Sequence, residues 1–260
     1  IDGSANPTEV YSSDIELNKV CFEVSNTYNN AQKVVDCLAS PYFLEALESL
    51  LGIKGVIPLS KFRTHNKSTR KYLHIMRDKG FLGSHVDQSH IDLEYIHILS
   101  CIFYASEQWG EDQGGHTTLF TSDGSQAVTK INYQPNRLAI FLHTSTSFHG
   151  VSKLNTSNNR YSIYMDYYLP IQKLDQFKES CKQLTNQDYP SYWEHDVVFF
   201  SVDSKSNYTQ HYNQYILDGK NPDKYFHVLK NPIQRTLKFT KSRLKFFKNK
   251  LIYKIKKLFS

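Results

Sequence analysis

Histidine followed two positions later by aspartate occurs twice within a few residues of this chain, at His85/Asp87 and at His90/Asp92. If either pair lies in a strand, its imidazole and carboxylate project from the same face and can present two donor atoms to one point. Two donors do not make a metal site, so the chain must supply a third. The surrounding sequence has to decide which pair, if either, binds a metal.

A third histidine, His149, follows the apolar run Leu138–Leu142, and Arg160 and Ser162 come after it on the next predicted strand. Two histidines and one carboxylate on one face of a metal leave positions open, which is the arrangement of non-haem Fe(II) oxygenases. Arg160 and Ser162 share a strand face, and a guanidinium beside a hydroxyl can bind a carboxylate in fork geometry. Such a pair suits the distal carboxylate of 2-oxoglutarate, whose 2-oxo acid end chelates iron.

These residues also have plainer interpretations. A lone histidine beside an apolar strand is by default a hydrogen-bonded core residue, and an arginine can be a surface ion-pair partner. The run Tyr161–Tyr168 is typical of a buried strand, however, and a buried guanidinium requires an anion. Gly114 and Gly115 are explained by a hairpin turn alone, and Trp109 by packing near that turn. Four further histidines are ambiguous between pocket and core: His74, His97, His116 and His143.

The elements that must position these residues are mainly short strands. Ser40-Pro41 and Gly52 are start and stop signals around apolar residues at helical spacing, which predicts a helix, and a weaker helix covers residues 31–38. Residues 1–13 are polar and are expected to fray. Strands are predicted at residues 72–76, 96–104, 117–121, 138–142 and 161–168. Strands without interleaved helices predict an antiparallel sandwich or barrel, with the helices outside it.

Four stretches resemble, in order and spacing, the Fe(II)/2-oxoglutarate dioxygenases of the prolyl-4-hydroxylase-like group. They are GFLGSHVD, HILSCIFYASEQWGEDQGGHTTLF, NRLAIFLHTSTSFHGV and NNRYSIYMDYYL. The resemblance implies a mainly β (α+β) double-stranded β-helix, a jelly-roll relative of the cupins, with flanking helices. It implies that His85, Asp87 and His149 are the catalytic metal ligands and that Arg160 and Ser162 bind 2-oxoglutarate.

The resemblance also implies the reaction. Fe(II), 2-oxoglutarate and O2, with ascorbate as reductant, would hydroxylate an unactivated C–H bond of a small-molecule or glycan/lipid-linked substrate and release succinate and CO2. Asp87 favours hydroxylation, because halogenases of this superfamily lack that carboxylate. A protein (prolyl-type) hydroxylase stays open as an alternative. So does a non-enzymatic metal-containing β-barrel binding module, although a structural metal would be closed by protein ligands and would leave Arg160 and Ser162 without a purpose.

Alignment with the family motif places His90 and Asp92 in a loop beyond the metal site. Two departures concern the co-substrate contacts. Many relatives carry a tyrosine upstream of the His-x-Asp motif, where this chain has Ile75-Met76-Arg77, and Ser106 replaces a family asparagine. Tyr104, at the family's second tyrosine position, is expected to contact 2-oxoglutarate instead.

The charge of the chain is concentrated at one end. Residues 230–260 hold 11 of the 31 Lys and Arg residues and no acid, which leaves 20 basic and 25 acidic residues, a net charge of −5, for residues 1–229. The body therefore has no electrostatic footprint for nucleic acid. Apolar residues of the tail repeat at helical spacing: Leu237, Leu244, Phe247, Leu251, Ile255 and Leu258. The pattern predicts a basic amphipathic helix that lies on an anionic membrane surface or packs on the acidic body.

These features divide the chain into an N-terminal helical support (residues 1–70), a catalytic core (71–170), covering elements (171–229) and the basic tail (230–260). Four cysteines without metal-type spacing, one of them in an apolar run at Cys101, favour a reducing compartment. We therefore expect a cytoplasmic protein, peripheral at the inner face of a membrane if the tail binds there. The chain shows no signal peptide and no apolar run long enough to span a bilayer, and it begins with Ile, so the true N-terminus can be missing.

Overall fold

The computed structural model describes residues 9–12, 16–22, 29–62, 72–91, 94–190, 192 and 198–199. All of these lie within one compact unit, residues 1–210. Asp92 and the tail, residues 230–260, lie outside the described residues, and so does the boundary predicted between residues 70 and 71.

The described strands are β1 (Glu9–Ser12), β2 (Glu16–Phe22), β3 (Ile57–Pro58), β4 (Leu73–Val86), β5 (His90–Ile91), β6 (Tyr95–Tyr104), β7 (Thr117–Phe120), β8 (Ala127–Ile131), β9 (Leu138–Leu142), β10 (His149–Val151), β11 (Arg160–Pro170) and β12 (Val198–Phe199). The described α-helices are α1 (Asn29–Leu38), α2 (Pro41–Leu51) and α3 (Leu174–Thr185), and short 3-10 helices lie at Leu59–Lys61, Glu111–Gln113 and Ile171–Lys173. The strand predictions from residue 72 onward are confirmed, and every described pairing is antiparallel.

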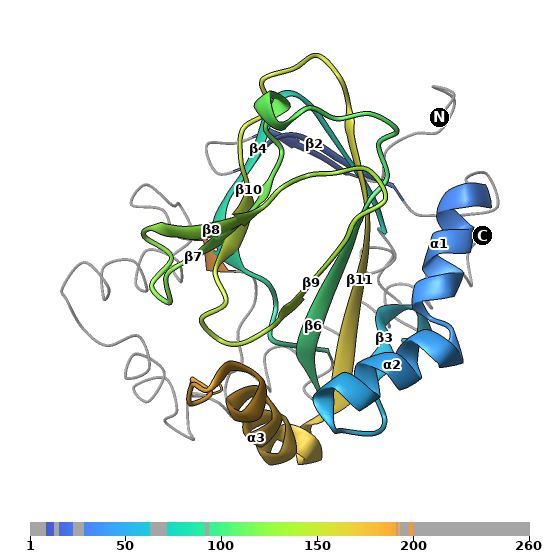
Figure 1. Cartoon of the computed structure of the whole chain (residues 1–260), viewed down its shortest axis with the longest axis vertical. Coiled ribbons are helices and arrows are strands. Elements are labelled where there is room, and N and C mark those ends of the chain that lie inside the picture. The colour runs from blue at the N-terminus through green and yellow to red at the C-terminus, as the bar shows by residue number, and fades with distance from the viewer. Residues whose placement is uncertain are drawn as a thin grey trace, which may run out of the picture. The chain divides into compact units, whose positions relative to one another are not determined.

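Strand β4 joins the two halves of the β-structure. The strands follow the hydrogen-bonded order β5-β6-β11-β4-β10-β7-β8. Strand β9 lies off this path and pairs with β6. The first part of β4, Leu73–Met76, pairs with β11, whereas Leu82 and His85 pair with β10. Between them the side chains of Arg77–Lys79 are exposed, and Lys79 has a left-handed φ of 59°. Strand β4 therefore changes partner within one continuous sheet, and the described strands are consistent with a double-stranded β-helix (Figure 1).

Helices α1 and α2 cover the outer face of β6 and β11 (Figure 1). Helix α2 forms where it is predicted: the Ser40 hydroxyl accepts a hydrogen bond from the Phe43 N–H, and Gly52 ends the helix with a φ of 65°. Its buried residues Leu47 and Leu51 share one core with residues of β6 and β11. Each such leucine contributes roughly 1.5–3 kcal/mol on burial. No helix in the described part of the chain is both long and apolar enough to cross a membrane.

Two features of the fold differ from expectation. Residues 9–12, within the segment expected to fray, form β1 and pair with β2, which in turn lies along β4. Strand β8 was also missed, and its first four residues are exposed. Neither segment alternates clearly between apolar and polar residues, so the local pattern carried no strand period; backbone pairing with the neighbouring strand holds each of them in place.

Candidate active site

The three expected metal ligands lie together at the junction of β4 and β10. The antiparallel register places His149 directly opposite His85, and Asp87 follows the last residue of β4. The Asp87 oxygens Oδ1 and Oδ2 lie 3.4 Å from His85 Nε2 and 3.2 Å from His149 Nε2. The potential ligand atoms of the three residues all lie within 4.8 Å of one another. One ion could therefore contact all three side chains.

Hydrogen bonds on the far side of each imidazole determine which nitrogen faces the carboxylate. His85 Nδ1 lies 2.9 Å from the Gly83 carbonyl oxygen, and His149 Nδ1 lies 3.0 Å from that of Ser147. A carbonyl only accepts, so each Nδ1 carries a proton, and each Nε2 is the nitrogen that faces the Asp87 carboxylate. Metal-bound histidines are typically oriented by such backbone contacts. Without a proton on Nε2, the two imidazoles and the one carboxylate are a donor set that fits Fe(II).

The pKa shifts of Asp87 and His85, but not that of His149, favour the protonation states that a metal requires. Burial would raise the pKa of Asp87, but the charge of His149 and hydrogen bonds from both histidines outweigh it and hold that pKa well below its usual range. Burial lowers the pKa of His85, and repulsion from His149 lowers it further. For His149, burial lowers the pKa but the Asp87 carboxylate raises it by more. The carboxylate is therefore ionised and His85 is neutral near neutral pH.

Arg160, at the start of β11, is buried with part of its guanidinium unused. Its Nε donates to the Gly115 carbonyl at 2.7 Å, and Nη1 donates to the Ser162 hydroxyl. Nη2 is buried and has no hydrogen-bond partner among the described residues. Leaving a buried charged donor unpaired is costly, and an anionic ligand would remove that cost. Its carbon Cζ lies 4.7 and 5.4 Å from the ring centroids of Tyr133 and Tyr104.

Tyr104 connects the arginine with the cavity. Its side chain is buried, and its hydroxyl donates to Thr117 Oγ1 at 2.7 Å. Burial raises the pKa of Tyr104, so the phenol stays neutral and acts as a donor. Thr117 in turn lines the cavity that contains the metal-ligand candidates. The structure thus places Tyr104 beside Arg160, and its contact with 2-oxoglutarate stays a prediction.

Sequence reasoning missed two residues that orient Arg160. Gly115 was explained by a turn alone, but its carbonyl accepts the Nε–H bond, its φ is +72°, and a Cβ there would lie 3.0 Å from Arg160 Cδ. A Gly-Gly pair indicates that another group lies close to the backbone, but the sequence does not show which group that is. Tyr133 lies between β8 and β9, and its hydroxyl donates to Ser106 Oγ at 2.8 Å. No motif surrounds it.

The cluster opens into a cavity of about 390 Å³. Its walls include His74, His97, Ile102, Tyr164, Asp166 and Tyr168. Side chains alternate along β11, so Tyr164 and Asp166, which line the cavity, lie on the same strand face as Arg160 and Ser162, while Ile163 and Met165 pack in the outer core. The remaining two ambiguous histidines lie elsewhere: His116 accepts the Tyr133 N–H, and His143 contacts the Asp87 carbonyl.

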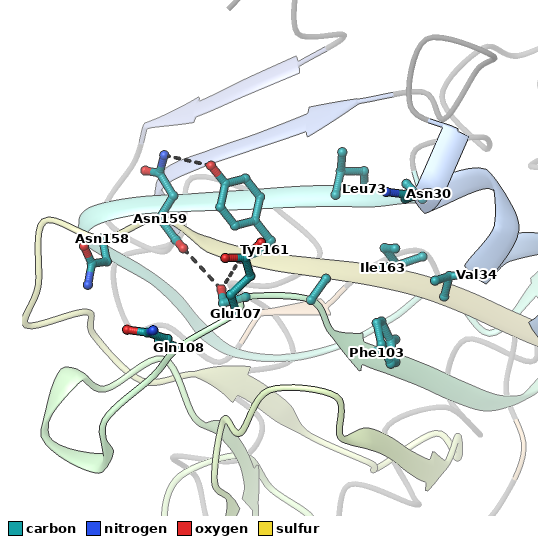
Figure 2. A pocket seen from close by; sticks show the side chains of 13 residues that line it. Asn30, Val34, Leu73, Phe103, Glu107, Gln108, Asn158, Asn159, Tyr161 and Ile163 are labelled. Atoms are coloured by element: carbon teal, nitrogen blue, oxygen red, sulfur yellow. Dashed lines mark hydrogen bonds between the residues drawn. The ribbon is translucent and has the colours of Figure 1, made fainter. Parts of the chain in front are cut away.

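A larger pocket of about 1110 Å³ lies on the opposite face of the same strands (Figure 2). Its floor is apolar, with Phe103 and Ile163, and its rim carries amides such as Asn159, whose side chain donates to the Tyr161 hydroxyl at 3.2 Å. It contains no histidine, and Glu107 is its only acid among the described lining residues. Size therefore does not identify the reactive site here; the donor set does.

His90 does not join the metal-ligand cluster. It lies in β5, half-buried, with Nδ1 3.0 Å from the Ser89 hydroxyl. Within the described part of the chain, the group with metal-ligand spacing is His85, Asp87 and His149. The expectation that Asp92 lies in a loop beyond the site falls outside the described residues.

Residues 71–168 match the model of the 2OG-Fe(II) oxygenase superfamily. Similar solved structures include a prolyl-4-hydroxylase from Pseudomonas putida (15% identity, 61% of this chain and 76% of that one, TM-score 0.41). Also similar is a Trichoplax adhaerens prolyl hydroxylase in complex with a hypoxia inducible factor peptide (14% identity, 62% of this chain and 69% of that one, TM-score 0.39). A third is a viral collagen prolyl hydroxylase from Paramecium Bursaria Chlorella virus-1 (13% identity, 60% of this chain and 80% of that one, TM-score 0.38). No curated protein matches.

The family match, together with the site, defines the class of protein. Residues 71–168 match the 2OG-Fe(II) oxygenase superfamily, which is the superfamily that the motifs resemble. The matched region and its His-Asp-His site support a 2-oxoglutarate-dependent non-haem iron dioxygenase, and the superfamily implies Fe(II), 2-oxoglutarate and O2 as cofactor and co-substrates.

Proposed function

We propose that the protein hydroxylates an unactivated C–H bond of a small-molecule or glycan/lipid-linked substrate at a metal held by His85, Asp87 and His149. The observation that carries the proposal is the cluster of two Nε2 atoms and one carboxylate in the wall of a cavity. When bound, Fe(II) with 2-oxoglutarate supplies the oxidising chemistry: one oxygen atom of O2 enters the substrate, the other enters succinate, and CO2 is released.

The chain's own residues bind and orient the reactants. The unpaired Nη2 of Arg160 supports a role for this guanidinium in holding the distal carboxylate of 2-oxoglutarate, with the Ser162 hydroxyl beside it. The rings of Tyr104 and Tyr133 cover the guanidinium and keep water from it. In such a dry setting the ion pair is stronger than in water. The apolar side chains of Ile102 and Leu82 line the cavity nearby.

The size of the cavity supports a small substrate. About 390 Å³ is near the lower end of the range for small-ligand sites, roughly 300–1,000 Å³, and 2-oxoglutarate must share that space. A single small molecule or one terminal unit of a glycan fits this description better than a folded protein surface. A prolyl-type peptide is the alternative substrate, presenting one side chain. The opening beside the cluster argues against a closed structural metal site.

The proposal predicts that purified protein converts 2-oxoglutarate into succinate only when Fe(II) and O2 are present. Slow turnover without substrate is expected, and the correct substrate class should raise it and gain one oxygen atom by mass spectrometry. Small hydroxylated compounds, lipid-linked glycans and prolyl peptides would be tested in parallel, with ascorbate as reductant. Chelated protein is the control. Protein that binds Fe(II) and 2-oxoglutarate by calorimetry yet forms no succinate with any class would refute the hydroxylase.

The basic tail supports a second part of the proposal, that residues 230–260 bring the enzyme to an anionic membrane surface. The body, at −5, would be repelled there without the tail's 11 positive charges. Each Lys or Arg near such a surface contributes about 1 kcal/mol, screened over roughly 8–10 Å. Basic residues beside an apolar stripe are the pattern of interfacial helices.

Deletion after Lys230 should release the protein from anionic liposomes and leave substrate-free 2-oxoglutarate turnover close to normal. Co-sedimentation with anionic and neutral vesicles at increasing salt measures the binding, which should weaken with salt and be poor on neutral vesicles. A full-length variant with Lys245, Lys248 and Lys250 changed to Glu is the matched control and should bind weakly. A truncated protein that unfolds or stops turning over would mean that the tail packs on the body.

A further inference from the structure

Two histidines hold the turn that carries Asp87, and neither has a role in the proposed reaction. The carbonyl oxygens of three consecutive residues, Asp87, Gln88 and Ser89, each accept a hydrogen bond. His143 Nε2 lies 3.2 Å from the Asp87 oxygen, and His97 Nδ1 lies 3.1 Å from the Gln88 oxygen. The backbone N–H of His97 donates to Ser89 at 2.9 Å. Because a carbonyl only accepts, the ring nitrogen in each side-chain bond carries a proton.

The second nitrogen of His97 also faces acceptors. Its Nε2 lies 3.1 Å from the Leu99 carbonyl oxygen and 3.4 Å from Asp166 Oδ1. Both ring nitrogens are therefore donors, which is the doubly protonated, positively charged form of the imidazole. Burial lowers the pKa of His97, but the Asp166 carboxylate raises it by more. The Ser100 hydroxyl donates to the same carboxylate oxygen at 3.0 Å, so Asp166 is held in place as the counter-ion.

Packing leaves these rings little freedom. His97 stacks on His143 with ring centroids 3.9 Å apart and an interplanar angle of 15°, and on Tyr168 at 5.0 Å and 24°. His97 and His143 are 3% and 1% exposed. His143 is further tied to β6 by its backbone N–H, which donates to Ile98 at 2.8 Å. The donors that face the turn therefore come from β6 and from the residue after β9, two paired strands of the core.

We propose that His97 and His143 are positioning residues for the metal site, and that Asp166 positions His97. The two rings hold the turn so that the Asp87 carboxylate stays between the Nε2 atoms of His85 and His149. The inference rests on the proposed function in one respect, that Asp87 is a metal ligand. Without these bonds the metal itself would have to order the turn, and part of its binding free energy would be lost to conformational entropy.

Metal affinity measured without turnover tests this inference. Anaerobic titration with Mn(II), in the absence of 2-oxoglutarate, would compare wild type with His143→Phe and His143→Gln. Phe keeps a flat ring in the stack but has no donor, whereas the Gln amide can replace the Nε2–H bond to the Asp87 carbonyl. Loss of such supporting contacts typically weakens metal binding 10- to 100-fold. We expect a loss of about that size for Phe and substantial recovery for Gln.

Two further variants provide independent comparisons. Asp166→Asn keeps the size of the side chain but removes the charge that stabilises the His97 imidazolium, and it should weaken Mn(II) binding in the same direction. His90→Phe is the matched control, because the His90 ring contacts the Ser89 hydroxyl, and it should bind Mn(II) like wild type. Thermal unfolding of each metal-free variant separates loss of affinity from loss of fold.

The outcomes distinguish this inference from the proposed function. If His85→Ala binds Mn(II) like wild type, the metal site itself is misassigned and the proposed function fails with it. If His85→Ala loses Mn(II) while a folded His143→Phe binds as tightly as wild type, only the positioning inference is overturned. Should His143→Phe not fold, Asp166→Asn decides: wild-type affinity in that variant, or equal affinity in Asp166→Asn and His90→Phe, refutes the inference.

Discussion

Alanine at His85, Asp87 or His149 should each reduce iron-dependent succinate formation to the background of metal-free protein. Among the described residues, these three form the group of His, Cys, Asp or Glu side chains whose ligand atoms all lie within 4.8 Å of one another, and two remaining donors bind Fe(II) weakly. Succinate release and Fe(II) binding by anaerobic titration measure the two effects separately. The fold should persist, because each side chain lies at the end of a strand, outside the apolar core of β6, β11 and the helices.

The neighbouring pair provides the control for this prediction. His90→Ala and Asp92→Ala should leave Fe(II) binding nearly unchanged, because His90 is bonded to Ser89 and does not reach the cluster. If His90→Ala empties the metal site while His85→Ala does not, the assigned register of the motif is wrong. Thermal unfolding of every metal-free variant would exclude a trivial loss of structure.

Arg160→Ala should raise the 2-oxoglutarate concentration needed for half-maximal turnover by about 30- to several-thousand-fold. Removing one partner of a buried charge pair costs about 2–5 kcal/mol, largely because the other charge is left unpaired, and each 1.4 kcal/mol is tenfold in affinity. Turnover at saturating 2-oxoglutarate should fall much less, since the metal ligands are untouched. The measurement is KM against kcat for 2-oxoglutarate in substrate-free turnover, with direct binding by calorimetry.

Two variants sharpen the arginine test. Arg160→Lys keeps the charge but not the planar fork that bonds to both Gly115 and Ser162, so it should recover only part of the affinity. Arg137→Ala removes an exposed arginine that bonds the Asn132 carbonyl, and it should not alter 2-oxoglutarate dependence. An Arg160→Ala protein with unchanged 2-oxoglutarate dependence would remove the co-substrate assignment.

Local patterns predicted some of the elements near the site, but not strand β10 or the part of β4 that carries His85. Helix α2 is bounded by Ser40 and Gly52, whose capping geometry depends on neighbours a few residues away. Strand β11 places Arg160 and Ser162 on one face because side chains alternate along any strand. The His-x-Asp spacing predicted that His85 and Asp87 lie together, and the resemblance of four stretches to one family agreed with His149 as the third ligand. Such predictions hold because the interactions involved are short in sequence.

Only the tertiary structure determined which residues contact these strand faces. The pairing of His149 with His85 depends on the register of β10 along β4, and register is set by contacts across the sheets, not by either strand alone. The Gly115 carbonyl on Arg160, the Tyr133 ring over it and the His97–His143 stack under the Asp87 turn join segments far apart in the chain. A sequence pattern states which way a side chain points; only the folded chain brings its partner to that side, because the partner's position is the sum of many packing contacts.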